Sequence, residues 1–85
     1  MERNTLITKN FSEIYNMTDV EGERAESLGK TEEMNKIMDI FVKYEEILAK
    51  FNQDRENLDD DNIYNHYISI TEKLISQTND IAKTF

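Results

Sequence analysis

The sequence predicts an all-α protein, an antiparallel bundle of three helices built from a short N-terminal helix and a long helical hairpin. Apolar residues recur at alternating steps of three and four from Thr31 to Leu58, which places them on one helical face. The opposite face carries three acid-then-base pairs at i, i+4, a spacing that favours a helix. The chain has no proline and only two glycines, which leaves few turn signals for a sheet.

Length and charge bound the remaining possibilities. Eighty-five residues form one domain at most, residues 1–85. The formal charge of −8 disfavours direct binding to nucleic acids or anionic membranes and favours basic partners. No segment has the apolar run of a secretory signal or a membrane span, so a cytoplasmic protein with no membrane partner is expected.

The first helix is expected over residues 4–18, followed by an acidic linker over 19–30. Apolar residues at helical spacing support the helix: Leu6, Ile7, Phe11, Ile14 and Tyr15. Beyond Met17 the apolar pattern weakens around Gly22. Either the helix continues and the glycine costs about 1 kcal/mol relative to alanine, or the helix breaks near Asp19–Gly22 and the linker is only partly helical. We favour the break.

The second helix is expected over residues 31–57. Gly29 suits the left-handed position that ends a preceding helix, and Thr31 suits the N-cap of the next one. Met38, Ile40 and Ile47 widen the apolar face, so this helix should contact two neighbours. Val42 is the one apolar residue that points away from this face, as single exposed apolar residues often do.

The third helix is expected over residues 61–84. Asp59, Asp60 and Asp61 should form the turn and the N-cap, because acids are stabilised at that end of a helix. The helix carries two adjacent apolar seams, which again implies two neighbouring surfaces. Gln77 and Thr78 interrupt the seams. They either fix the register of the bundle or lie at the rim of the core, and we favour the rim.

The sequence offers little support for catalysis or for a bound cofactor or metal. There is no cysteine, and His66 is the only histidine, so a zinc site would lack its usual ligands. The acids of Asp54–Asp61 lack the spacing and the glycine of a calcium loop. We therefore predict that the protein is not an enzyme and that it needs no cofactor.

A short first helix could not cover both long helices, so part of their apolar surface should form an interface. The protein is then an interaction module that forms a homodimer, completing a larger bundle, or docks on another helical protein. The predicted interface consists of Ile37, Phe41, Tyr44, Leu48, Phe51, Tyr67, Ile70, Leu74 and Ile81.

Two alternatives remain open. An acidic helical protein could mimic the phosphates of a nucleic acid and block a basic DNA- or RNA-binding protein, although the interspersed lysines of the second helix interrupt a continuous negative face. The acidic patch would consist of Asp54, Glu56, Asp59, Asp60 and Asp61. The other alternative is a monomeric three-helix domain with a thin core and no uncovered seam.

Overall fold

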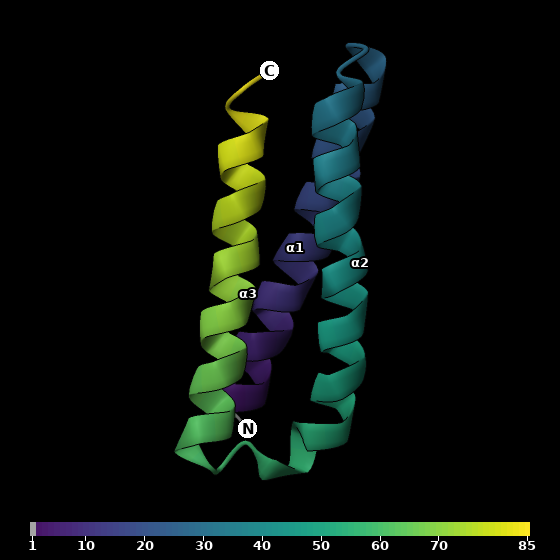
Figure 1. The fold of residues 1–85 in the computed structure, drawn as a ribbon. Helices are drawn as coiled ribbons and strands as arrows, with labels where there is room; N and C mark the ends of the chain where they lie inside the picture. The colour runs from purple at the N-terminus through teal and green to yellow at the C-terminus, as the bar shows by residue number, and fades with distance from the viewer. Residues whose placement is uncertain (1) are drawn as a thin grey trace.

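The computed structural model describes residues 2–85, and within them the chain forms three long helices (Figure 1). Helix α1 spans Glu2–Ser27, α2 spans Thr31–Asp54 and α3 spans Asp61–Ala82, with a short 3-10 turn, η1, at Arg55–Asn57. The helices run up, down and up, so α2 is antiparallel to both α1 and α3. The bundle measures 44 × 19 × 16 Å. The predicted antiparallel three-helix bundle is confirmed.

The first helix is much longer than the predicted 4–18. It runs without a break through Gly22, so most of the predicted linker 19–30 is helical. Its buried positions keep a helical spacing almost to its end: Ile7, Phe11, Ile14, Thr18 and Ala25. Packing of this face against the other helices offsets the low helix propensity of the glycine, as tertiary contacts commonly do.

The turn between α1 and α2 is closed by Gly29, as predicted. Gly29 has a φ of +69°, its N–H donates to Glu26 O at 3.1 Å, and the Lys30 N–H donates to Ala25 O at 2.8 Å. This pair of bonds is the Schellman ending of a helix. Helix α2 then begins at Thr31 itself and Lys30 occupies the N-cap, one residue earlier than we predicted.

The turn between α2 and α3 uses its aspartates as predicted. Asp60 is the N-cap of α3, and its carboxylate accepts hydrogen bonds from the backbone N–H groups of Asn62 at 2.9 Å and Ile63 at 3.4 Å. Helix α2 ends at Asp54, three residues before the predicted boundary, because the chain tightens into η1 there.

All three helices contribute to the core. Its buried apolar residues are Ile7, Phe11, Ile14, Ala25, Ile37, Ile40, Phe51, Leu58, Tyr67 and Leu74. Ring contacts connect the helices: Phe11 of α1 packs on Phe51 of α2 at 5.2 Å between centroids, and Phe51 packs edge-on against Tyr67 of α3 at 5.4 Å. Helix α1 therefore covers the face of the α2–α3 hairpin that we expected to be open.

Three threonines lie inside this core. Thr18 is nearly buried and Thr71 and Thr78 are fully buried, and each hydroxyl donates to the carbonyl four residues earlier in its own helix. The interpretation of Thr78 as a rim residue is therefore wrong, whereas Gln77 is only partly buried. A hydroxyl bonded within its own helix enters a core without leaving an unpaired polar group.

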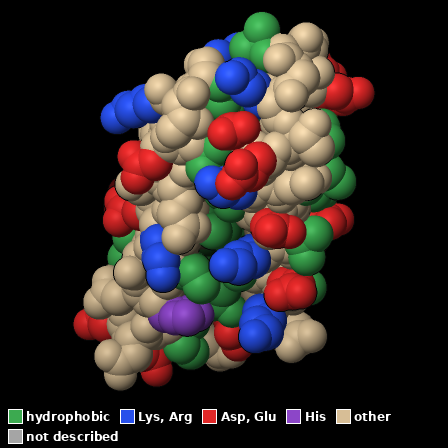
Figure 2. All heavy atoms as spheres, turned by 45° about the horizontal axis from the view of Figure 1, so that its top comes forward, with side chains coloured by type: hydrophobic (Ala, Val, Ile, Leu, Met, Phe, Trp, Pro, Cys, Tyr) green, Lys and Arg blue, Asp and Glu red, His purple; other side chains and the backbone are tan. Residues whose placement is uncertain are grey.

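The face over α2 and α3 carries charges of both signs. Figure 2 shows Lys, Arg, Asp and Glu side chains interspersed around small apolar areas, with His66 exposed near one end. Neither sign forms a continuous field on this face. Within residues 2–85, no helix combines the length and the apolar character that crossing a membrane requires.

Candidate functional site

The residues of the predicted interface lie mostly inside the bundle. Ile37, Phe51, Tyr67 and Leu74 are at most 3% exposed, and the other five are partly buried. Their burial follows from the length of α1, which has 26 residues and packs along both α2 and α3. Within the monomer most of these side chains pack in the core, and two of them, Ile37 and Phe41, also line an open groove.

An open groove of about 510 Å³ runs between α1 and α2. We call it the α1–α2 groove. Its apolar lining, which we call the floor, consists of Tyr15, Met34, Ile37, Met38, Phe41 and Val42. Its acidic lining, which we call the rim, consists of Asp19, Glu23, Glu26 and Glu45. Thr18 and Gly22 complete the lining.

The groove is built from one stripe on each helix that overlaps the stripe entering the core, since Thr18 and Ile37 belong to both. On α1 the stripe runs from Tyr15 to Glu26, and on α2 it runs from Met34 to Glu45, and in both the lining residues recur at i, i+3, i+4, i+7, i+8 and i+11. Each stripe spans twelve residues, and its two end residues are about 16 Å apart along the helix axis at 1.5 Å per residue. Because α1 and α2 are antiparallel, Glu26 lies at the end near Met34 and Tyr15 at the end near Glu45.

The floor contains several apolar side chains that are about half exposed and lie in one groove. Tyr15 is 49% exposed, Met38 56% and Val42 52%, and all three line the same groove. Tyr15 also packs against the rings of Phe41 and Tyr44, with centroid distances of 6.1 and 6.2 Å. These ring contacts hold one wall in place, and a contiguous apolar patch on a small protein is typical of an interaction site.

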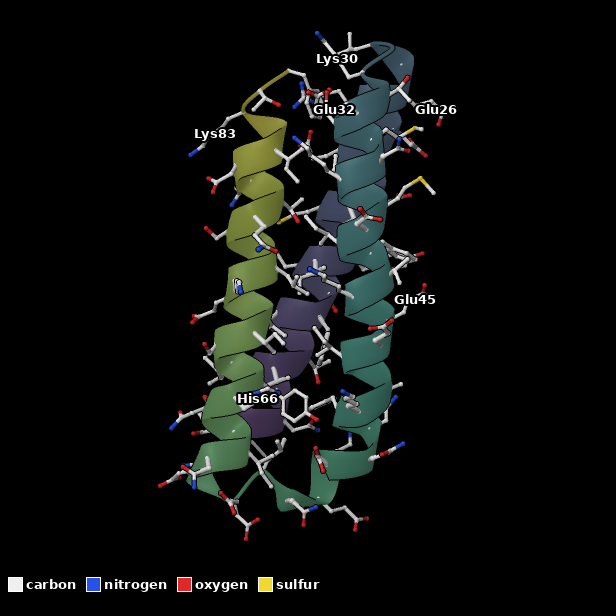
Figure 3. All side chains as sticks on the ribbon, viewed as in Figure 1. Glu26, Lys30, Glu32, Glu45, His66 and Lys83 are labelled. Atoms are coloured by element: carbon white, nitrogen blue, oxygen red, sulfur yellow. The ribbon has the colours of Figure 1, made fainter. Side chains whose placement is uncertain are left out.

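The rim of the groove is uniformly negative. No Lys or Arg lines it, and none of its four carboxylates forms an ion pair within the part of the chain that the structure describes. Figure 3 shows Glu26 and Glu45 projecting from α1 and α2 on the side of the bundle away from α3. Burial raises the pKa of Tyr44 beside the groove, and Tyr15 and Glu45 raise it further. The rim therefore presents unneutralised negative charge around an apolar floor.

The predicted acidic patch has a different character, because three of its five carboxylates serve the fold. Asp54 accepts a hydrogen bond from the Tyr67 hydroxyl at 2.7 Å, and Asp60 caps α3. Asp61 pairs with Arg3 at 2.6 Å, and the same guanidinium donates to Leu58 O at 2.8 Å. These bonds tie the start of α1 to the loop before α3, while Glu56 and Asp59 lie exposed.

Of the residues that line the groove, only Ile37 and Phe41 belong to the interface predicted from the sequence. Val42 was interpreted as an isolated exposed residue, although Met34, Met38 and Phe41 share its side of α2. An apolar stripe on one helix predicts a groove only when a neighbouring helix is known to run beside it. The matching stripe on α1 exists only because α1 continues to Ser27.

A second pocket of about 530 Å³ is lined by Glu2, Arg3, Leu58 and Asp59, and its Arg3 guanidinium is already bonded to Leu58 O and Asp61. Residues 2–85 contain no group of three His, Asp or Glu side chains that could hold a metal ion. Comparisons with known protein families, curated proteins and solved structures gave no match for this chain.

Proposed function

We propose that the protein is a protein–protein interaction module that binds its partner in the α1–α2 groove. The observation that carries this proposal is the half-exposed apolar floor formed by Tyr15, Met38 and Val42 in one groove. Covering these side chains would remove apolar surface from water, which is the main favourable contribution in most protein association. The closed three-helix core behind the groove provides a preformed surface, so little ordering is needed on binding.

The partner is a different protein, not a second copy of this chain. A two-fold dimer through the groove would place each acidic rim against the same rim of its partner. Like charges brought together in this way repel, and each chain already carries a formal charge of −8. The predicted interface for a homodimer is also occupied by the chain's own core. We therefore expect a monomer whose partner carries the opposite charge.

Site-specific photo-cross-linking tests the location of the interface. A benzophenone amino acid replaces Met38 in the groove or, as the control, Val20, which is 58% exposed and lies outside the groove. In an extract of the source cells, Met38 should give one discrete cross-linked protein and Val20 should not. Equal cross-linking from both positions, or none from Met38, would contradict the proposal.

Sedimentation velocity tests the absence of self-association. At concentrations of about tens of micromolar, the protein should sediment as a monomer and its thermal midpoint should not depend on concentration. A midpoint that rises with protein concentration would instead favour the homodimer.

A further inference from the structure

We infer that the α1–α2 groove binds a basic amphipathic helix about three turns long, an inference that rests on the proposed function. Such a helix carries apolar residues on one face and lysines or arginines beside them. It is recognised by the combination of an apolar groove and an acidic rim, and neither feature alone would select it.

The length and shape of the groove suit a helix. Its walls are two antiparallel helices that run side by side for about 16 Å, and this equals about three turns of a third helix. Helical ligands bind such grooves through apolar anchors at i, i+3 or i+4, and i+7. Met34 and Met38 line the floor with flexible, polarizable side chains that adapt to the shape of the inserted anchors.

The charges select a cationic ligand. Carboxylates stand on both walls, with Asp19, Glu23 and Glu26 on α1 and Glu45 on α2. A helix lying on the floor would place the residues at the edges of its apolar face next to these carboxylates. Lysine or arginine at those positions would form salt bridges and accelerate association, whereas acidic residues would be repelled.

Gly22 gives a further reason to regard the groove as a binding site. Glycine is disfavoured inside a helix, and Gly22 has neither a positive φ nor a close neighbour that would require it. A Cβ at this position would lie 3.7 Å from Ile37 Cγ2, an ordinary contact, so packing of α1 on α2 tolerates alanine. The missing side chain instead leaves the middle of the groove open for a ligand.

Binding of designed peptides to the full chain tests this inference. The probe is a synthetic helical peptide of about 14 residues with leucines on one face and lysines flanking them, titrated by calorimetry at low and high salt. We expect saturable one-to-one binding that weakens with salt. A peptide with glutamate in place of lysine should not bind, and one with serine in place of leucine should bind at least about tenfold more weakly.

Variants of the protein locate the binding. The double variant Asp19→Asn/Glu23→Gln should weaken the lysine peptide by about tenfold. The control Glu72→Gln/Asp80→Asn removes the same charge from exposed positions on α3 and should change the affinity less than about twofold. Equal effects of the two double variants would show attraction to the net charge alone and would overturn the inference.

A variant that fills the groove completes the test. Gly22→Leu places a side chain over the middle of the floor and should abolish binding with helicity retained, as judged by circular dichroism. Met38→Ser/Val42→Ser, at two exposed positions, provides the same test if Gly22→Leu does not fold. If either of these variants folds and binds the lysine peptide with wild-type affinity, the inference is overturned. If the lysine peptide fails to bind while cross-linking from Met38 persists, the basic helix is wrong and the interaction module stands.

Discussion

Tyr67 of α3 donates a hydrogen bond to the carboxylate of Asp54, the last residue of α2, at 2.7 Å. The tyrosine is only 3% exposed and its ring packs edge-on against Phe51, so the hydroxyl is the one polar part of a core side chain. Burial, and then the bond to Asp54 and its charge, raise the pKa of Tyr67 from 10.0 to about 12. This contact joins the end of α2 to α3 beside the turn that connects them.

The Tyr67–Asp54 contact predicts a dependence of stability on alkaline pH. A tyrosine whose pKa is higher in the folded state contributes its full stability below the unfolded pKa, and it loses that contribution as pH rises through the folded pKa. Tyr67→Phe should therefore destabilise the protein by about 1–2 kcal/mol at neutral pH, where Asp54 loses its charged hydrogen bond. The difference between wild type and variant should shrink between pH 10 and pH 12. Urea denaturation across this range measures it.

Tyr15→Phe is the matched control for Tyr67→Phe. The Tyr15 side chain is about half exposed and its hydroxyl makes no hydrogen bond in the described part of the chain, so this change should leave stability within about 0.5 kcal/mol of wild type. A Tyr67→Phe variant as stable as Tyr15→Phe at neutral pH would show that the hydrogen bond contributes nothing.

The two glycines should respond to alanine in opposite directions. At Gly22 the backbone is helical and an added Cβ meets only an ordinary contact, so Gly22→Ala should stabilise the protein by about 0.5–1 kcal/mol. At Gly29 the φ of +69° strains any residue with a Cβ, so Gly29→Ala should destabilise it by about 1 kcal/mol. Urea midpoints, compared at constant m-value, show whether each substitution raises or lowers the free energy of unfolding. Destabilisation by Gly22→Ala would mean that the glycine is needed for the fold.

The course of α2 and α3 could be predicted from the sequence because local and tertiary preferences agree there. The apolar stripe, the charge pairs and the aspartate cap all indicate helix. Around Gly22 they disagree, since local propensity predicts a break while packing of Ala25 into the core continues the helix. Tertiary packing cannot be weighed before the neighbouring helix is known, so the length of α1 could not be predicted.

The wrong length predicted for α1 also led us to expect the candidate site at a different location. A short first helix implied an open seam on α2 and α3, whereas the full-length α1 fills most of that seam and forms a groove with an adjacent stripe of α2 that shares Ile37 and Phe41 with it. From the sequence, Met38 belongs to the widened apolar face of this helix and Val42 lies outside that face. Their role depends on which side α1 approaches α2, and a single helix pattern does not contain that information.

Arg24 near the end of α1 should be important for the last turn of α3. Its guanidinium donates to Ala82 O at 2.9 Å and Phe85 O at 2.8 Å, and to the carboxylate of Glu21 at 2.7 Å. It also lies over the ring of Phe85, 4.1 Å from the centroid. Lysine keeps the charge but cannot reproduce this planar set of donors. Arg24→Lys should therefore destabilise the protein by about 1 kcal/mol and speed amide exchange in the last turn of α3.

Arg55→Lys is the control for Arg24→Lys, because it makes the same substitution at an exposed arginine whose contact is a more distant one, 5.3 Å from the Phe51 ring centroid. Its effect should stay below about 0.5 kcal/mol, with no change in exchange at the end of α3. Equal exchange rates in the two variants would contradict the role of Arg24 as a cap.

The buried threonines Thr71 and Thr78 have the same shape but different partners, so valine should affect them differently. Among the described residues the Thr78 hydroxyl bonds only to Leu74 O of its own helix, and valine of similar volume removes that hydroxyl without leaving a donor unpaired. The Thr71 hydroxyl also accepts a hydrogen bond from the Asn10 side chain of α1 at 3.0 Å. Thr78→Val should be neutral within about 0.5 kcal/mol, whereas Thr71→Val should destabilise by about 1–2 kcal/mol, because the partly buried Asn10 amide loses its partner.

The double-mutant cycle of Thr71→Val with Asn10→Leu isolates the interhelical bond. If the unpaired amide causes the loss, Thr71→Val should cost much less in the Asn10→Leu background, giving a coupling of about 1 kcal/mol. Additive effects, measured by urea denaturation, would mean that Thr71→Val acts through packing alone. Coupling would instead identify Asn10–Thr71 as a polar contact that sets the register of α1 against α3, a role that the less favoured of our two sequence-based interpretations gave to Gln77 and Thr78.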